Sequence, residues 1–158
     1  MYKSYYYLNR LALELNSLIP GKKILSIFSQ EKDRLIFHLS KDEDVFMEIS
    51  VNHSEPYINI RNRFSRAKKN TITFFDELIG AAITEVRIAS DDRILKIVTE
   101  RGVLFFAIRG KYTNLFYSAG KSIQSFKNED EEILSQLLVE FTEKTYIDKI
   151  NLPDFSSL

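Results

Sequence analysis

Residues 21–35 read GKKILSIFSQEKDRL, and residues 80–94 read GAAITEVRIASDDRI. Both stretches begin with a glycine, continue with an apolar run and end at an Asp-Arg pair, at one constant offset (80 − 21 = 59) that needs no gap. Self-similarity at a fixed offset is the signature of an internal repeat. The sequence therefore predicts two copies of one unit, spanning residues 4–60 and 64–118.

Each copy contains short apolar runs separated by polar turns, the pattern of an antiparallel meander of four strands. Apolar residues at helical spacing predict helices over 5–19 and 71–79, the first capped by Ser4. A third helix is expected over 129–147, with Asn128 as its N-cap and Glu131 closing a capping box.

A lone sheet of this kind buries one face, and two copies can bury their apolar faces against each other. We therefore expect residues 1–158 to form a single α+β domain. Its centre would be an internally duplicated antiparallel β-sandwich of two four-stranded sheets with flanking helices.

The composition bounds the functional class. The 158 residues carry a formal net charge of zero, 44% hydrophobic residues and no cysteine, which excludes disulfides, zinc ribbons and thiol nucleophiles. The N-terminal segment has no signal-peptide pattern, and no apolar run approaches the ~20 residues that span a bilayer, so we expect a cytoplasmic protein. A neutral chain exerts no general attraction on nucleic acid, so any RNA site must be a local patch.

Three local patches could bind RNA, and each has a simpler alternative. The first is a basic segment that surrounds Phe64, where cations would neutralise phosphates and the ring would stack on a base; the alternative is a solvated linker. Its basic residues are Arg61, Arg63, Arg66, Lys68 and Lys69.

The second patch is the pair Asp92-Arg93, where the carboxylate would orient the guanidinium towards phosphate or base edges; the alternative is a strand-entry turn. The third is the donor-rich set Arg109, Lys111 and Asn114, which could equally be an ordinary hairpin turn.

Nothing in the sequence indicates catalysis. His38 and His53 are the only histidines, and neither belongs to a paired-ligand motif, so no metal site is expected. There is no paired-carboxylate motif and no glycine-rich phosphate loop. We expect a protein that is not an enzyme and needs no cofactor.

The order of the motifs resembles the N-terminal domain of the NFACT family, which includes the fibronectin-binding protein A homologues, RqcH and NEMF. The matching features run from an amphipathic first helix to a glycine-basic stretch, over roughly residues 5–126. They are LALELN at 11–16, GKKI at 21–24, SQEKD at 29–33, EISVNHSEPYI at 48–58, Gly80, Arg87-Ile88, Asp92-Arg93 and GKYTN at 110–114.

The resemblance implies a role in ribosome-associated quality control, with tRNA and the large ribosomal subunit as partners and Asp92-Arg93 contacting tRNA. It also implies a fold similar to that of the formamidopyrimidine DNA glycosylase N-terminal domain. Those enzymes need a proline at position two followed by a glutamate, and here Tyr2 and Lys3 stand there, so glycosylase chemistry is not expected.

The chain departs from the family pattern in ways that keep other functions open. The chain ends at Leu158 without the family's further domains. The stretch FFDEL at 74–78 is acidic where the family tends to be basic, and Tyr112 replaces a usual histidine. The expected function is thus a non-catalytic RNA-binding module, and the alternative is a protein-interaction module that kept the fold without binding RNA. A surface adhesin is a third and weaker hypothesis, because no export signal is present.

Overall fold

The computed structural model describes residues 5–64 and 71–147. The first helix, α1 (Tyr5–Leu18), buries its apolar stripe and ends before Pro20, as the sequence predicts. Its proposed cap, Ser4, lies outside the described residues. No helix in the described part of the chain is long and apolar enough to cross a membrane.

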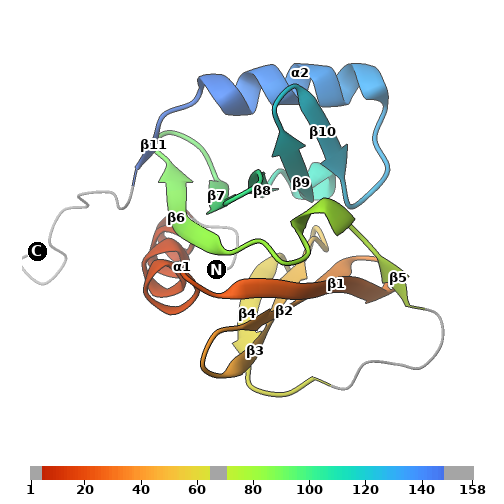
Figure 1. The fold of residues 1–158 in the computed structure, drawn as a ribbon. Coiled ribbons are helices and arrows are strands. Elements are labelled where there is room, and N and C mark those ends of the chain that lie inside the picture. The colour runs from red at the N-terminus through yellow and green to blue at the C-terminus, as the bar shows by residue number, and fades with distance from the viewer. Residues whose placement is uncertain (1–4, 65–70, 148–158) are drawn as a thin grey trace, which may run out of the picture.

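The strands form two antiparallel sheets that face each other across one core (Figure 1). The first sheet has the order β4-β3-β2-β1-β5, and the second has the order β10-β9-β8-β7-β6-β11. The strands of the first sheet are β1 (Lys23–Glu31), β2 (Arg34–Ser40), β3 (Asp44–Ser50), β4 (Tyr57–Arg61) and β5 (Ile72–Thr73). Those of the second are β6 (Ile83–Ala89), β7 (Ile94–Thr99), β8 (Val103–Ala107), β9 (Asn114–Ala119), β10 (Ser122–Ser125) and β11 (Tyr146–Ile147).

The predicted β-sandwich is confirmed, but the sheets have five and six strands where four each were expected. Three strands are additional, and one of them is β10. The other two, β5 and β11, contain two residues each and pair with the free edges of β1 and β6. Runs this short carry no readable alternation in a sequence. β10 forms a tight hairpin with β9 through Gly120, which has a φ of +61°.

The internal repeat is visible in the hydrogen bonds that join the two sheets. The N–H of Gly21 donates to Ile83 O, and the N–H of Gly80 donates to Ile24 O, each over 2.7 Å. Gly80 is the repeat equivalent of Gly21, and Ile83 is that of Ile24, so each bond is the counterpart of the other. Lys23 pairs with Ala82, which is its own equivalent in the second copy. The two copies therefore meet around a local two-fold axis, as two subunits of a symmetric dimer would.

The strand bulges repeat as well. β1 is irregular between Ile24 and Ser26, and β6 is irregular between Ile83 and Glu85, which are the equivalent positions. A bulge adds a residue and increases the local twist. The shared bulge therefore bends both strands at the point where they leave the junction.

The helix predicted over 71–79 is wrong. This segment forms β5, a turn at Phe75 with a φ of +50°, and a single 3-10 turn, η1 (Asp76–Leu78). A helix would direct the neighbouring side chains Phe74 and Phe75 to different sides. The left-handed turn instead lets Phe74 pack on Phe126 and Phe75 pack on Tyr117.

The C-terminal helix, α2 (Glu131–Glu143), is shorter than predicted and has Asp130 as its N-cap in place of Asn128. It covers the outer face of the second sheet, as Figure 1 shows at the top of the molecule. Phe141 is fully buried there, between Phe105 at 5.0 Å and Phe116 at 5.2 Å, measured between ring centroids. Among the described residues, no helix covers the outer face of the first sheet.

Candidate nucleic-acid interface

The outer face of the first sheet carries polar and aromatic side chains where the second sheet is apolar. At the repeat offset, Phe46 corresponds to Phe105, while Glu48 corresponds to Ala107. In the second sheet these positions lie under α2. In the first sheet the Glu48 carboxylate stands where the second sheet has the Ala107 methyl group, so an apolar helix would not pack well on this face.

Strand alternation positions the side chains of this face. Odd and even residues point to opposite faces, so Ile36 on β2 and Glu48 on β3 face outward, while Phe37 and Met47 enter the core. In the register, Ile36 lies opposite Glu48, and Glu48 lies opposite Asn59 on β4. Glu48 therefore lies on an inner strand, whose backbone pairs with a neighbouring strand on both sides.

Glu48 is a buried carboxylate, with 3% of its surface exposed. Its Oε2 accepts a hydrogen bond from the Tyr57 hydroxyl (2.7 Å) and one from Arg61 Nη2 (3.3 Å). A buried charge is tolerated only when it is paired and hydrogen-bonded, and these two groups supply that. Burial of the phenol, together with Glu48, raises the pKa of Tyr57 to about 12.

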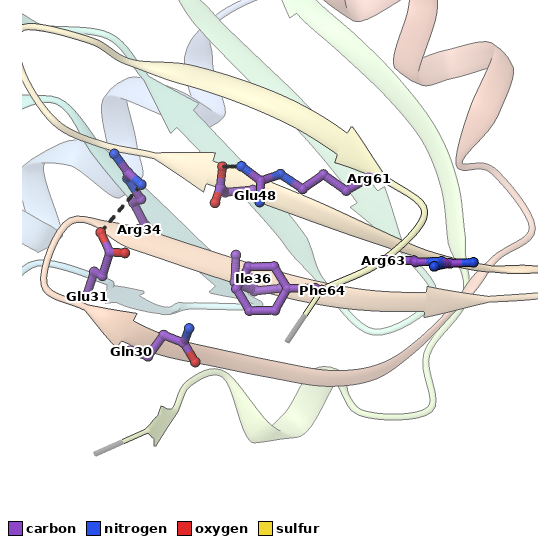
Figure 2. A pocket seen from close by; sticks show the side chains of 8 residues that line it. All are labelled: Gln30, Glu31, Arg34, Ile36, Glu48, Arg61, Arg63 and Phe64. Carbon is purple, nitrogen blue, oxygen red and sulfur yellow. Dashed lines mark hydrogen bonds and ion pairs between the residues drawn. The ribbon is translucent and has the colours of Figure 1, made fainter. Parts of the chain in front are cut away.

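A pocket of about 410 Å³ opens above this carboxylate (Figure 2). Figure 2 shows Arg34 and Arg63 towards opposite ends of the pocket, with Glu48 and Phe64 between them. The lining residues are Gln30, Glu31, Arg34, Ile36, Glu48, Arg61, Arg63 and Phe64. Three guanidinium groups and two carboxylates give this pocket an excess of one positive charge.

An aromatic cluster forms one wall of the same face. Phe64 makes an edge contact with Phe28 at 5.7 Å and a tilted contact with Phe46 at 6.1 Å. His38 stacks on Phe46 at 4.4 Å, and its Nε2 lies 3.2 Å from Asp44 Oδ2. Phe64 is only half buried, so part of its ring remains available to the pocket.

The second predicted patch, Asp92-Arg93, lies directly before β7 of the other sheet, and its carboxylate has several partners within the protein. Asp92 Oδ1 accepts a hydrogen bond from the Arg93 backbone N–H (2.7 Å). Its Oδ2 pairs with Arg109 at 3.0 Å and with Lys144 at 3.3 Å. Burial alone would raise the pKa of Asp92, but the Arg93 N–H and the two cations outweigh it and hold the pKa below its usual range.

Arg109 is held in that network as well. It makes a two-pronged contact with Glu140 of α2 and lies over the Phe141 ring at 5.4 Å. The hydrogen bond to Glu140 is the main reason that the pKa of Arg109 is raised. Asp92 and Arg109 therefore fasten α2 to the second sheet, a structural role that requires no ligand.

The remaining predicted residues fall into three situations. Asn114 is 2% exposed, and its side-chain amide pairs with the Lys127 backbone through bonds of 3.0 and 2.9 Å, so it does not reach the surface. Lys111 is exposed and lies over the Tyr112 ring. Arg66, Lys68 and Lys69 lie outside the described residues.

The structure thus brings Arg61 and Arg63 into one pocket with two residues that the sequence analysis missed as site residues, Arg34 and Glu48. Strict alternation along β2 and β3 would have placed both on the outer face. Among the described residues, no three His, Asp or Glu side chains come together to form a possible metal site.

Several solved structures have a similar fold, and three of them are bacterial proteins. The N-terminal domain of the fibronectin-binding protein PavA from Streptococcus pneumoniae superposes with a TM-score of 0.69 and 20% identity, over 79% of this chain and 54% of that one. The N-terminal part of the fibronectin/fibrinogen-binding protein from Streptococcus suis gives 0.66 and 18%, over 79% and 55%. The fibrinogen-binding protein from Staphylococcus aureus gives 0.62 and 15%, over 79% and 51%.

No family model matches the sequence, and no curated protein matches it. The chain spans about half the length of the solved structures it resembles. At these identities the likeness concerns the fold. The solved structures are fibronectin- or fibrinogen-binding proteins, the group that the order of the motifs resembles. Their likeness confirms the expected fold of two packed sheets.

Proposed function

We propose that this protein is a non-catalytic RNA-binding module of the ribosome-associated quality control type, which contacts tRNA or large-subunit rRNA through the outer face of its first sheet. One observation supports this most: Arg34, Arg61 and Arg63 surround a single pocket that also contains the half-buried ring of Phe64. Guanidinium groups bind phosphate through several donors, and an aromatic ring stacks on any base.

The geometry favours this pocket over the Asp92-Arg93 turn as the RNA surface. Among the described residues, Arg34 forms an ion pair with the exposed carboxylate of Glu31, at 3.5 Å, and such surface pairs contribute little stability, so another anion can replace the carboxylate. Arg109, in contrast, is held by two carboxylates and a ring beneath α2. Asp92 and Arg109 are therefore already engaged within the protein.

The test is binding of tRNA, followed by fluorescence anisotropy over a range of salt concentrations. We expect wild-type affinity to fall steeply as salt rises, because each phosphate contact releases counterions. Arg34→Ala/Arg63→Ala should weaken binding and lower the slope of log K against log salt by about 1 to 2. The double variant Arg10→Ala/Lys121→Ala removes the same charge from two exposed residues elsewhere and should leave the slope unchanged.

A third variant, Asp92→Ala/Arg93→Ala, asks whether the turn contributes instead. Loss of binding in this variant alone, with the fold intact, would move the site to the second sheet. If wild-type protein does not bind tRNA at low salt, the RNA-binding proposal fails.

The second candidate is a protein-interaction module, which the names of the fold neighbours favour, since they are described as fibronectin- or fibrinogen-binding. Exposed apolar side chains such as Tyr6 and Leu13 on α1 could serve such a contact. The affinity of an apolar interface should not fall as salt rises. Binding to soluble fibronectin that persists at high salt would therefore favour this candidate over the first.

A further inference from the structure

We propose that the pocket above Glu48 holds one unstacked nucleobase and selects bases that carry an amino group, cytosine over uracil being the clearest case. This inference rests on the proposed RNA-binding function and deepens it, because it adds a base-reading group to a surface that would otherwise bind only phosphate.

The first argument is the unused oxygen of the buried carboxylate. Both hydrogen bonds that described residues donate to Glu48 end on Oε2, so Oε1 has no donor in the described part of the chain. Glu48 lines the pocket although only 3% of it is exposed. Because Glu48 lines an open pocket, a ligand N–H that enters can donate a hydrogen bond to this carboxylate, and bonds to an ionised acceptor are stronger than bonds between neutral groups.

The second argument is that the acceptor is held in place. Tyr57 and Arg61 fix the carboxylate from the same strand, β4, and Glu48 itself lies on β3, which pairs with a strand on each side. A fixed carboxylate accepts hydrogen bonds from the exocyclic amino group of cytosine, a pairing known from base-edge recognition. Uracil presents a carbonyl oxygen at the same position, which would face the carboxylate with no proton between them.

The third argument concerns size and surroundings. A volume of about 410 Å³ is within the range of small-molecule sites, so one base fits, but a stacked duplex does not. The Phe64 ring offers a stacking surface and Ile36 an apolar floor, while Arg34 and Arg63 can contact the flanking phosphates. Stacking attracts every base and phosphate contacts carry no sequence information, so discrimination must come from polar groups that reach base edges. Among those that line the pocket, Glu48 is the one that is buried and held by two hydrogen bonds.

The experiment compares oligocytidylate and oligouridylate of equal length, which have the same backbone and pyrimidine ring size. For wild-type protein we expect oligocytidylate to bind on the order of tenfold more tightly. Glu48→Gln keeps the shape but presents both an amide oxygen and an N–H, so the ratio should fall to within about twofold. Glu43→Gln, an exposed residue on the β2–β3 turn, makes the same charge change and should keep the wild-type ratio.

Phe64→Ala supplies a second readout, because it should weaken both oligomers by a similar factor without changing their ratio. Thermal unfolding of each variant confirms that the fold is kept. If both oligomers bind with equal affinity and Glu48→Gln changes nothing, the base pocket is wrong although RNA binding stands. If neither oligomer nor tRNA binds, the proposed function itself fails.

Discussion

Removing the ring of Phe141 tests how α2 is attached to the molecule. Phe141 is the one residue of α2 that is fully buried, and it contacts Phe105, Phe116 and the Arg109 guanidinium. Truncation of a buried phenylalanine to alanine costs about 3–5 kcal/mol, because apolar contacts are lost and a cavity remains. Phe141→Ala should therefore lower the melting temperature by roughly 6 to 20 °C for a chain of this size.

The assay is urea unfolding followed by circular dichroism, with hydrogen exchange to locate the loss. The control is Val139→Ala on the same helix, where 55% of the side chain is exposed, and it should change stability by less than about 0.5 kcal/mol. If α2 detaches without unfolding the sandwich, its amides lose protection while those of β6 to β9 keep theirs. A loss below about 1 kcal/mol in Phe141→Ala would refute the view that this ring anchors the helix.

Two further changes test the turn at β8 and the network around Asp92. Gly102→Ala would place a methyl group 2.5 Å from Tyr117 Cε1 and 2.7 Å from Ser118 O, so we expect a loss of about 1–3 kcal/mol in urea unfolding, and a neutral result would contradict the packing described. Because the pKa of Asp92 is lowered in the folded state, its stabilising effect is complete above the unfolded value of about 3.9 and is lost as the pH falls through the folded value. Asp92→Asn should therefore be less stable than wild type at pH 7, and the gap should narrow towards pH 2; a constant gap would count against the ion pairs.

The strands of both copies could be predicted because short apolar runs alternate with polar turns along the sequence. β2 (Arg34–Ser40) is an example, since its apolar residues lie between two polar turns. The repeat could be predicted because both copies contain the glycine, the apolar run and the Asp-Arg pair at one constant offset.

The segment 71–79 was not predictable from periodicity. Ile72, Phe75 and Ile79 have helical spacing, but Ile72 is 63% exposed on a sheet edge, and Phe75 sits in a left-handed turn. Tertiary packing of Phe74 and Phe75 overrides the local pattern, because two adjacent rings are both needed in the core.

The candidate site was partly predictable. The density of arginine near Phe64 indicated Arg61 and Arg63 directly. Arg34 and Glu48 become part of the same pocket only through cross-strand register, which one sequence does not specify. The side chain of Asn114 is buried and forms hydrogen bonds with the Lys127 backbone. Nothing in the sequence GKYTN at 110–114 distinguishes a buried amide from an exposed one.

The first helix forms side-chain hydrogen bonds with the second half of the chain. The Tyr5 hydroxyl donates to the carbonyl of Ala89, 84 positions later, and Asn16 accepts from the Val86 N–H across 70 positions. Protein synthesis proceeds at about 5–20 residues per second, so several seconds pass between the emergence of α1 and that of β6. During that time the apolar stripe of α1 has no sheet to cover it, and the nascent chain must carry an exposed hydrophobic helix until its second half arrives.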